Sequence, residues 1–224
     1  MTTQALVATR VAELRDRIVR AGGVGVGIVA VTKNFGIDAW GDAKFAGCEA
    51  VGENYAQELI AKSQQINRVD RLPVHFIGQL QTNKIKSLID IVDVWQSVDR
   101  AAVVAELVKR HAGRAAGGRC EMLLQVNTTN ESDKGGCDPT EAKTLVEQAR
   151  QGGLDVTGLM TVGPTDMDPV KTRSAFSLLR QMAADLGVAQ LSMGMTADVE
   201  IAVEEGSTLV RIGTALFGQR PRSI

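Results

Sequence analysis

Cysteine is scarce in this chain, with only Cys48, Cys120 and Cys137 among 224 residues. The number is odd and no two cysteines are spaced as C-x-x-C, which argues against a disulfide framework and against a zinc site. We therefore expect no metal centre. A reducing compartment fits this cysteine usage best, so we expect a cytoplasmic protein.

The chain also has no excess of charge of either sign, because 25 Lys and Arg residues face 26 Asp and Glu residues, for a formal net charge of −1. This balance gives no general reason to expect a nucleic acid or an anionic membrane as partner. The longest uncharged apolar run, residues 21–31, is too short to cross a bilayer. Residues 2–23 have helical periodicity interrupted by charges, unlike a signal peptide. We expect no nucleic-acid partner, no membrane segment and no export signal.

Proline is rare as well, with five residues, and no low-complexity tract or linker divides the chain. The 44% of apolar residues supply material for a large core. A length of 224 residues exceeds that of most single domains but suits an α/β barrel. We predict one domain over residues 1–224.

Short apolar runs alternate with longer helix-like segments, a pattern typical of βα repetition and a parallel sheet. The predicted strands are residues 27–33, 50–53, 74–78, 92–97, 120–127, 156–162, 190–193 and 208–213. Helices fill the gaps, and one over residues 5–20 precedes the first strand. Eight such units favour a closed (β/α)8 barrel of the TIM type over a doubly wound sheet, which usually has fewer strands.

Two helix starts carry clear signals. Asp138 followed by Pro139 places a capping residue before a proline in the first helical position. Asp99 can cap a helix that runs to Arg110. Both helices begin after a predicted strand, as the repeat requires.

In a barrel of this type chemistry collects at the C-terminal ends of the strands. Polar residues fall at those ends: Lys33, Asn54, Gln79, Ser97, Asn127, Thr161, Ser192 and Arg211. Lys33 follows the apolar run VAVT, so its amine should emerge in the barrel mouth partly desolvated. Desolvation lowers the pKa of an amine from about 10.4 and frees the nucleophile. The alternative is a solvated lysine that ends a strand.

The segment LSMGMT, residues 191–196, should lie between a strand and a helix. Thr196 is a natural N-cap and Gly194 permits close backbone approach, so N–H groups of the first turn can face an anion. The alternative is an ordinary capped helix. Asp198 would repel a phosphate unless it points outward.

Arg211, Gly213 and Thr214 repeat this logic on the last strand, and barrel phosphate sites commonly use the loops after strands 7 and 8. A guanidinium facing a pyridine nitrogen stays charged and keeps that nitrogen unprotonated, which weakens the ring as an electron sink. The alternative for Arg211 is a salt bridge across the barrel end. A nucleophilic amine together with phosphate loops indicates an aldehyde phosphate held covalently, and pyridoxal phosphate is the common cofactor that needs both.

Nearly the whole chain resembles the pyridoxal phosphate homeostasis proteins, which are barrel relatives of the alanine racemase N-terminal domain. The matching segments are VAVTK, VGENYAQE, VHFIGQLQTNK, LLQVNTTNESDKGG, GLMTVGP and LSMGMTADVEIAVEEGSTLVRIGTALFG. The resemblance implies the barrel of fold-type III pyridoxal phosphate proteins without their second β domain. It implies a Schiff base on Lys33, a place for Asn54 near the phenolic oxygen of the ring, and Arg211 at the pyridine nitrogen. The residues that it implies around the phosphate are Ser192, Met193, Gly194, Met195, Thr196, Gly213 and Thr214.

The chain departs from the family after the lysine, where Asn34, Phe35 and Gly36 replace a polar residue followed by proline. Gln79 also stands where histidine or proline is frequent. We expect these changes to alter the loop over the cofactor and to leave the imine and phosphate positions intact.

The resemblance implies a carrier or regulator of vitamin B6 supply without catalytic turnover and without a catalytic residue. Its partners would be pyridoxal phosphate and apo-enzymes that receive it, and the protein would be a monomer or weak dimer. One alternative is a racemase-like enzyme, which needs a second acid or base opposite Lys33. In barrel racemases that group is a tyrosine from a second, β-rich domain, whereas this chain ends at Ile224 and has one tyrosine, Tyr55. Another alternative is a barrel that binds a different phosphorylated ligand without an imine.

Overall fold

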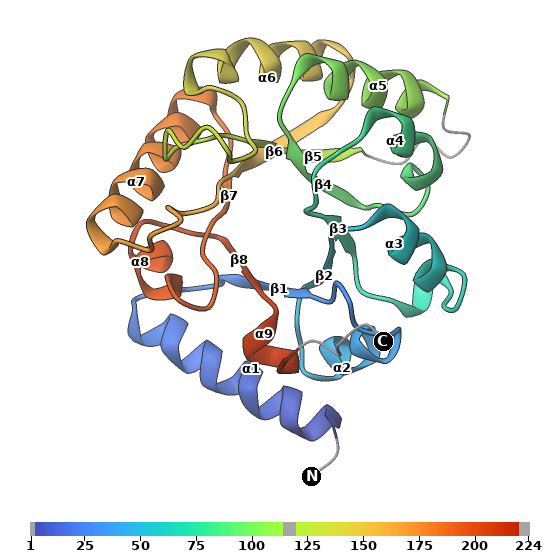
Figure 1. The fold of residues 1–224 in the computed structure, drawn as a ribbon, viewed down its shortest axis with the longest axis vertical. Coiled ribbons are helices and arrows are strands. Elements are labelled where there is room, and N and C mark those ends of the chain that lie inside the picture. The colour runs from blue at the N-terminus through green and yellow to red at the C-terminus, as the bar shows by residue number, and fades with distance from the viewer. Residues whose placement is uncertain (1–2, 114–119, 220–224) are drawn as a thin grey trace.

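The chain folds into a closed barrel of parallel strands in the computed structural model, which describes residues 3–113 and 120–219. The strands follow one another around the ring in chain order (Figure 1). They are β1 (Gly27–Val31), β2 (Ala50–Glu53), β3 (Val74–Phe76), β4 (Val94–Val98), β5 (Glu121–Gln125), β6 (Asp155–Met160), β7 (Gln190–Ser192) and β8 (Leu209–Ile212). Val29 in β1 lies opposite Arg211 in β8, and this pairing closes the ring. The predicted eight-stranded barrel is confirmed.

Several strands are shorter at their C-terminal ends than the sequence predicts. β1 ends at Val31, two residues before Lys33, and β3 ends at Phe76. The predicted polar residues at these ends therefore begin the βα loops instead of ending the strands. They still lie at the C-terminal face of the barrel, where the loops gather.

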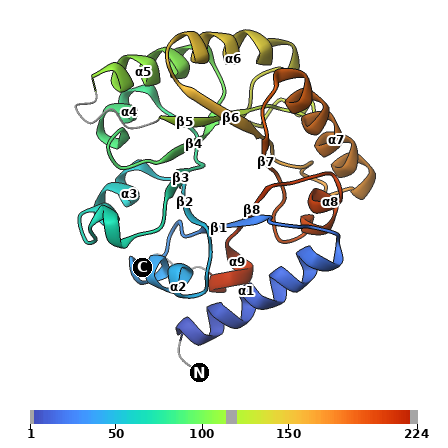
Figure 2. The ribbon, with the colours of Figure 1, turned by 180° about the vertical axis from the view of Figure 1, so that it is seen from behind.

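Helices surround the barrel on its outer side (Figures 1 and 2). They are α1 (Thr3–Arg20), α2 (Asp38–Phe45), α3 (Ala56–Ser63), α4 (Thr82–Leu88), α5 (Ala101–Ala112), α6 (Ala142–Gln151), α7 (Pro169–Leu186), α8 (Val199–Glu204) and α9 (Thr214–Phe217), with short 3-10 helices η1 (Arg68–Asp70) and η2 (Pro139–Glu141). The extra helix α1 precedes the first strand and packs against α2, α8 and α9. Its buried residues, Val7, Val11, Leu14 and Ile18, recur at helical spacing and form one apolar face.

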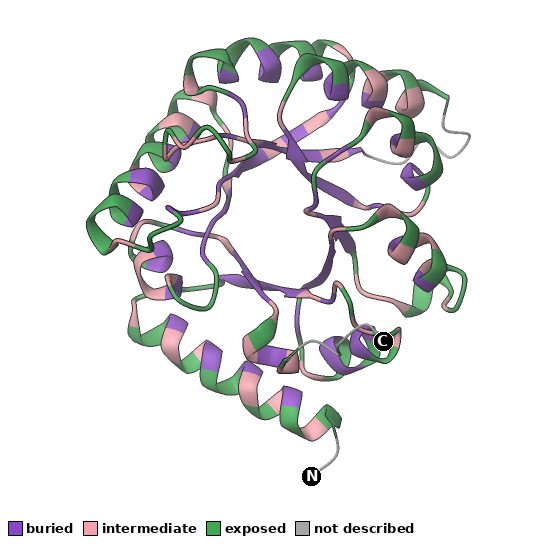
Figure 3. Cartoon of the chain, viewed as in Figure 1, coloured by how far each residue is buried: buried purple, intermediate pink, exposed green. Residues whose placement is uncertain are grey.

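The main hydrophobic core lies between the strands and the helices, and buried residues dominate the strands in Figure 3. A smaller apolar cluster of Val94, Leu123 and Met160 comes from β4, β5 and β6. The buried residues also include polar ones, among them Gln96 and Arg211. No helix in the described ranges combines the length and apolar character needed to cross a membrane.

One of the two predicted helix starts is confirmed. The Asp138 carboxylate accepts from the Thr140 N–H at 2.8 Å just ahead of η2 and α6. The prediction for Asp99 is wrong, because α5 begins at Ala101 and Arg100 takes the capping position without a side-chain hydrogen bond. Asp99 instead forms an ion pair with Arg100 at 2.6 Å.

Candidate functional site

A small hollow of about 160 Å³ opens at the C-terminal face of the barrel, beside β1 and β8. It is lined by Val31, Lys33, Phe35, Met195, Thr196, Arg211, Gly213 and Thr214. Six of these eight residues are site residues predicted from the sequence. They come from the ends of β1, β7 and β8, which the closed ring brings together. No group of histidine, cysteine, aspartate or glutamate side chains within the described residues is arranged to hold a metal ion.

Arg211 is the buried charge of this hollow, with 6% of its surface exposed. Nη1 donates to the Ser192 carbonyl at 2.6 Å and to Ser192 Oγ at 2.7 Å, and Nη2 donates to the Thr161 carbonyl at 2.7 Å. These partners are neutral oxygens, so they do not form the salt bridge considered as an alternative for this residue. Burial lowers the pKa of Arg211 to about 10, with Asp198 acting in the opposite direction. The guanidinium therefore stays charged at neutral pH.

A chain of polar side chains leads from Arg211 into the barrel. Ser192 Oγ donates to Gln96 Oε1 at 2.7 Å, and Gln96 Nε2 lies 2.5 Å from His75 Nδ1. Because Ser192 is in β7 and Gln96 in β4, their contact crosses the barrel interior. Burial lowers the pKa of His75 to about 4, so its ring is neutral at pH 7. The hydroxyl of Ser192, expected to face the phosphate, is thus already engaged.

The far end of this chain of side chains reaches a second hollow. His75 borders it together with the first residues of several strands, including Gly27, Ala50, Glu121 and Leu209. This hollow of about 600 Å³ therefore lies at the N-terminal face, opposite Arg211 and the predicted site.

The segment 191–196 differs from its predicted form. Met193 is fully buried in the hydrophobic core and does not line the hollow. Gly194 has φ +97°, and a Cβ there would lie 2.5 Å from Ala202, so this turn requires glycine for its conformation and its packing.

The predicted N-cap at Thr196 is wrong, because α8 begins at Val199. The Asp198 carboxylate accepts from the Met195 N–H at 2.5 Å, and residues 196–198 form a turn ahead of the helix. Asp198 points inward, since a Cβ on Gly163 would lie 3.0 Å from Asp198 Oδ2. Burial raises the pKa of Asp198.

Asn54, the first residue after β2, lines a neighbouring hollow with Tyr55, Gln79 and Lys84. Its Oδ1 atom is buried and has no hydrogen-bond partner among the described residues. Buried polar atoms are nearly always paired, so this amide oxygen is an exception among the described residues.

Sequence reasoning missed the residues that hold the loop of Lys33. The Thr32 carbonyl accepts from Lys62 Nζ at 2.8 Å, and the Asn34 N–H donates to Glu58 Oε1 at 2.7 Å. Glu58 and Lys62 are four residues apart on α3 and form an ion pair at 2.7 Å. That spacing in the segment QELIAK is the signal from which the pair could have been found.

Of the residues that depart from the family pattern, Phe35 borders the hollow beside β1 and β8, and Gln79 borders the neighbouring one. Asn34 has φ 65°, in the left-handed region. The ring of Phe35 lies 5.3 Å from that of Phe217 in α9, between ring centroids. The loop after β1 is therefore packed against the last helix.

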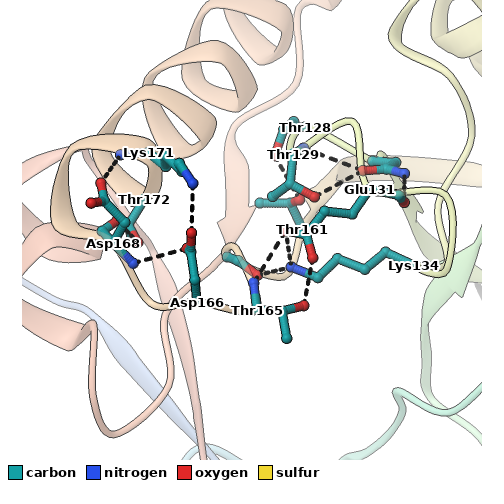
Figure 4. A network of polar contacts seen from close by, with 12 residues as sticks. Thr128, Thr129, Glu131, Lys134, Thr161, Thr165, Asp166, Asp168, Lys171 and Thr172 are labelled. Carbon is teal, nitrogen blue, oxygen red and sulfur yellow. Dashed lines mark hydrogen bonds and ion pairs between the residues drawn. The ribbon is translucent and has the colours of Figure 1, made fainter.

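The loops after β5 and β6 are joined by a polar network at the same face (Figure 4). Glu131 accepts from the Thr165 N–H at 3.1 Å, from its hydroxyl at 2.5 Å and from Lys134 Nζ at 3.1 Å. Lys134 also donates to the Gly163 carbonyl. The hydrogen bonds from Thr165 and Lys134 lower the pKa of Glu131 to about 2. We call Glu131, Lys134 and Thr165 the loop clamp.

Comparison with known proteins supplies independent findings. Residues 5–221 match the family model of the alanine racemase N-terminal domain. The chain is 39% identical over 199 residues to the pyridoxal phosphate homeostasis protein of Pseudomonas aeruginosa, covering 87% of this chain and 85% of the relative. It is 39% identical over 181 residues to the protein of that name from Aquifex aeolicus, covering 78% of each. The structure of PipY from Synechococcus elongatus with pyridoxal phosphate bound matches with a TM-score of 0.84 and 33% identity, covering 95% of this chain and 100% of PipY.

Proposed function

The chain belongs to the family of pyridoxal phosphate homeostasis proteins, and from this premise we propose that it binds pyridoxal 5'-phosphate as a Schiff base on Lys33 and buffers or delivers the cofactor. The observation that carries the proposal is the small hollow beside β1 and β8. Lys33, the buried Arg211 and Thr214 all border it. These groups supply an amine for the aldehyde, a cation for the ring nitrogen and a donor for the phosphate.

The residues that line the hollow fit the cofactor, and Asp198, which turns toward Gly163, is not among them. Thr196 and Thr214 are exposed at the rim, where a phosphate can be reached by their hydroxyls. The unpartnered amide oxygen of Asn54 lies at the end of β2, the strand next to β1. When bound, the cofactor supplies an aldehyde that combines reversibly with an amine. The chain itself fixes the guanidinium of Arg211 through three hydrogen bonds and brings the amine and the rim hydroxyls to the same hollow.

Arg211 favours binding over turnover. Its guanidinium remains protonated at neutral pH and donates hydrogen bonds only, so it leaves a ring nitrogen without a proton. A ring in that state is a poor electron sink. We therefore propose a non-catalytic carrier that passes cofactor to apo-enzymes. We also propose that it works in the cytoplasm as a monomer or weak dimer.

Borohydride trapping tests the Schiff base. Protein loaded with pyridoxal phosphate is reduced, digested and analysed by mass spectrometry, and the pyridoxyl group is expected on Lys33. Lys33→Ala should abolish the adduct, while Lys84→Ala, a lysine at the neighbouring hollow, should retain it. An adduct on another lysine would refute the assignment. A protein that binds the cofactor without an imine absorption band would favour a barrel for another phosphorylated ligand.

Transfer tests the carrier role. Loaded protein is mixed with an apo-enzyme that needs pyridoxal phosphate, and recovery of that enzyme's activity is followed. Recovery faster than spontaneous release of cofactor into a scavenger supports direct delivery. Recovery at the release rate restricts the role to buffering.

A further inference from the structure

The backbone on both sides of Lys33 is tied to one helix. Lys62 Nζ in α3 donates to the Thr32 carbonyl at 2.8 Å, just before the lysine. Glu58 Oε1, one turn earlier in α3, accepts from the Asn34 N–H at 2.7 Å, just after it. Glu58 and Lys62 are also bonded to each other at 2.7 Å. An ammonium and a carboxylate thus bracket Lys33 along the chain.

The bracketed turn adopts a backbone conformation that most residues avoid. Asn34 has φ 65°, and a residue other than glycine in this region carries a free-energy cost. The Phe35 N–H donates to the Thr32 carbonyl at 3.1 Å, which closes the turn around Lys33. The turn persists because other contacts hold it, and the hydrogen bond from Asn34 to a charged carboxylate is the strong type among them.

The remaining members of this network lie in the core. Lys62 Nζ also donates to Glu53 Oε1 at 2.6 Å, and that oxygen accepts from Trp40 Nε1 at 3.0 Å. The side chains of Lys62 and Glu53 are 4% and 0% exposed. Removing Lys62 would leave the buried Glu53 carboxylate without its cation, which destabilises a protein strongly. Glu58 is different, because its side chain is 22% exposed and Lys62 keeps Glu53 when Glu58 is lost.

We propose that Glu58 is a positioning residue for Lys33, an inference that rests on the proposed function. Through the Asn34 N–H it fixes the turn that directs the lysine side chain toward the hollow beside Arg211. Capture of pyridoxal phosphate by the amine needs the aldehyde and the nitrogen in one geometry, and such orientation contributes to the rate. Loss of Glu58 therefore slows capture and leaves the barrel folded.

Glu106 offers a matched control elsewhere in the molecule. It forms an i,i+4 pair with Arg110 in α5 at 2.6 Å, and its side chain is 20% exposed. The pair resembles that of Glu58 and Lys62 in spacing and length, and the two glutamates are similarly exposed. The hydrogen bond of Glu106 to Arg110 lies within α5 and reaches no residue of the loop that carries Lys33.

The test compares Glu58→Ala, Glu58→Gln and Glu106→Ala with the unmodified chain. The readouts are the rate at which the imine absorption band appears on addition of pyridoxal phosphate, the induced circular dichroism of that band, and the thermal midpoint. Glu58→Ala should slow capture by about ten-fold, the scale of one hydrogen bond to a charged group, and should change the induced dichroism. Glu58→Gln retains an acceptor oxygen and should recover most of the rate. Glu106→Ala should capture at the normal rate.

The outcomes separate two kinds of failure. An unmodified protein that forms no imine band refutes the proposed function, and the positioning role with it. An unmodified protein that forms the band, with Glu58→Ala equally fast, refutes only the positioning role. Glu58→Gln as slow as Glu58→Ala also refutes that role alone. Amide exchange adds a readout without cofactor, because the Asn34 amide should exchange faster in Glu58→Ala and not in Glu106→Ala.

Discussion

Thr196 and Thr214 present hydroxyls at the rim of the hollow, and single residues of this kind can be tested one at a time. Thr196→Ala and Thr214→Ala should each weaken binding of pyridoxal phosphate by about 1 to 3 kcal/mol, the usual value for a hydrogen bond to a charged group. Unphosphorylated pyridoxal should be little affected. Fluorescence titration with both ligands measures the difference, with the exposed Thr9→Ala on α1 as control. Equal losses for both ligands would remove phosphate recognition from these residues.

His75 should make stability depend on pH. Burial lowers its folded pKa to about 4, while the unfolded side chain titrates near 6.5. Between these values the unfolded chain binds the proton more readily than the folded chain. The contribution of neutral His75 to the free energy of unfolding is therefore complete above pH 6.5 and falls as the pH drops toward 4. The loss from pH 7 to pH 5 amounts to about 2 kcal/mol.

Urea denaturation at pH 7 and pH 5 checks this value. His75→Gln keeps a polar side chain next to Gln96 but cannot take up the proton. From pH 7 to pH 5 the unmodified chain should therefore lose about 2 kcal/mol more of its free energy of unfolding than this variant. His111→Gln replaces the other histidine and serves as the control. Equal pH dependence in His75→Gln and the unmodified chain would show that His75 is not the group responsible.

At the scale of elements, the loop clamp joins the loops after β5 and β6. Glu131→Ala removes the acceptor of the Thr165 N–H, so this amide should exchange with solvent faster, by about ten-fold or more for one hydrogen bond to a charged carboxylate. The thermal midpoint should change little, because the clamp lies on the surface. Since the pKa of Glu131 is about 2, the carboxylate is charged from neutral pH down to about pH 3, and the clamp should persist there. Exchange measured at pH 7 and pH 4 tests both expectations, and Glu147→Ala on α6 is the control.

The strands and most helices could be predicted because each leaves a local signal. A largely apolar run marks each strand, and Asp138 before Pro139 marks a helix start. Asp168 before Pro169 is the same signal at α7, where the Asp168 carboxylate accepts from the Val170 N–H at 2.9 Å. Asp99 was misleading because its carboxylate forms an ion pair with Arg100 and does not cap the helix. The start of α8 could not be placed, since it depends on whether Asp198 turns outward or back toward Met195.

The site could be predicted only in part, because the position of a residue along a strand does not show whether its side chain points into the barrel or toward the helices. Lys33 and Arg211 were found from their places at strand ends. Ser192 and Met193 are neighbours and so point to opposite sides, Ser192 into the barrel and Met193 into the surrounding core. The contact between Glu53 and Lys62 spans two elements, and only their relative placement reveals it.

At the scale of the whole molecule, we expect loaded protein to show at most trace racemisation, transamination or decarboxylation of common amino acids. In the proposed binding mode a charged Arg211 faces the ring nitrogen, which would disfavour carbanion chemistry, and proton transfer to a carbanion also needs a placed acid or base. Tyr55 is the one tyrosine of the sequence, and it is 51% exposed next to Asn54. A turnover of about 1 per second or more that is lost in Lys33→Ala would favour the racemase-like alternative. Chiral chromatography of incubated amino acids measures it.

With the Gln96 amide oriented so that its oxygen faces Ser192 and its nitrogen faces His75, the row of side chains that crosses the barrel has one consistent order of protons. Arginine can only donate, so Ser192 Oγ must accept from Arg211 and give its own hydrogen to Gln96. Gln96 then turns its NH2 group to His75, whose Nδ1 must be bare while Nε2 carries the hydrogen. One guanidinium thus sets the tautomer of a histidine at the opposite end of the barrel. A proton added to Nδ1 would reverse the glutamine, so that Ser192 Oγ accepts from donors on both sides and its own hydrogen loses its acceptor. Acid at one face of the barrel would then be felt at the other.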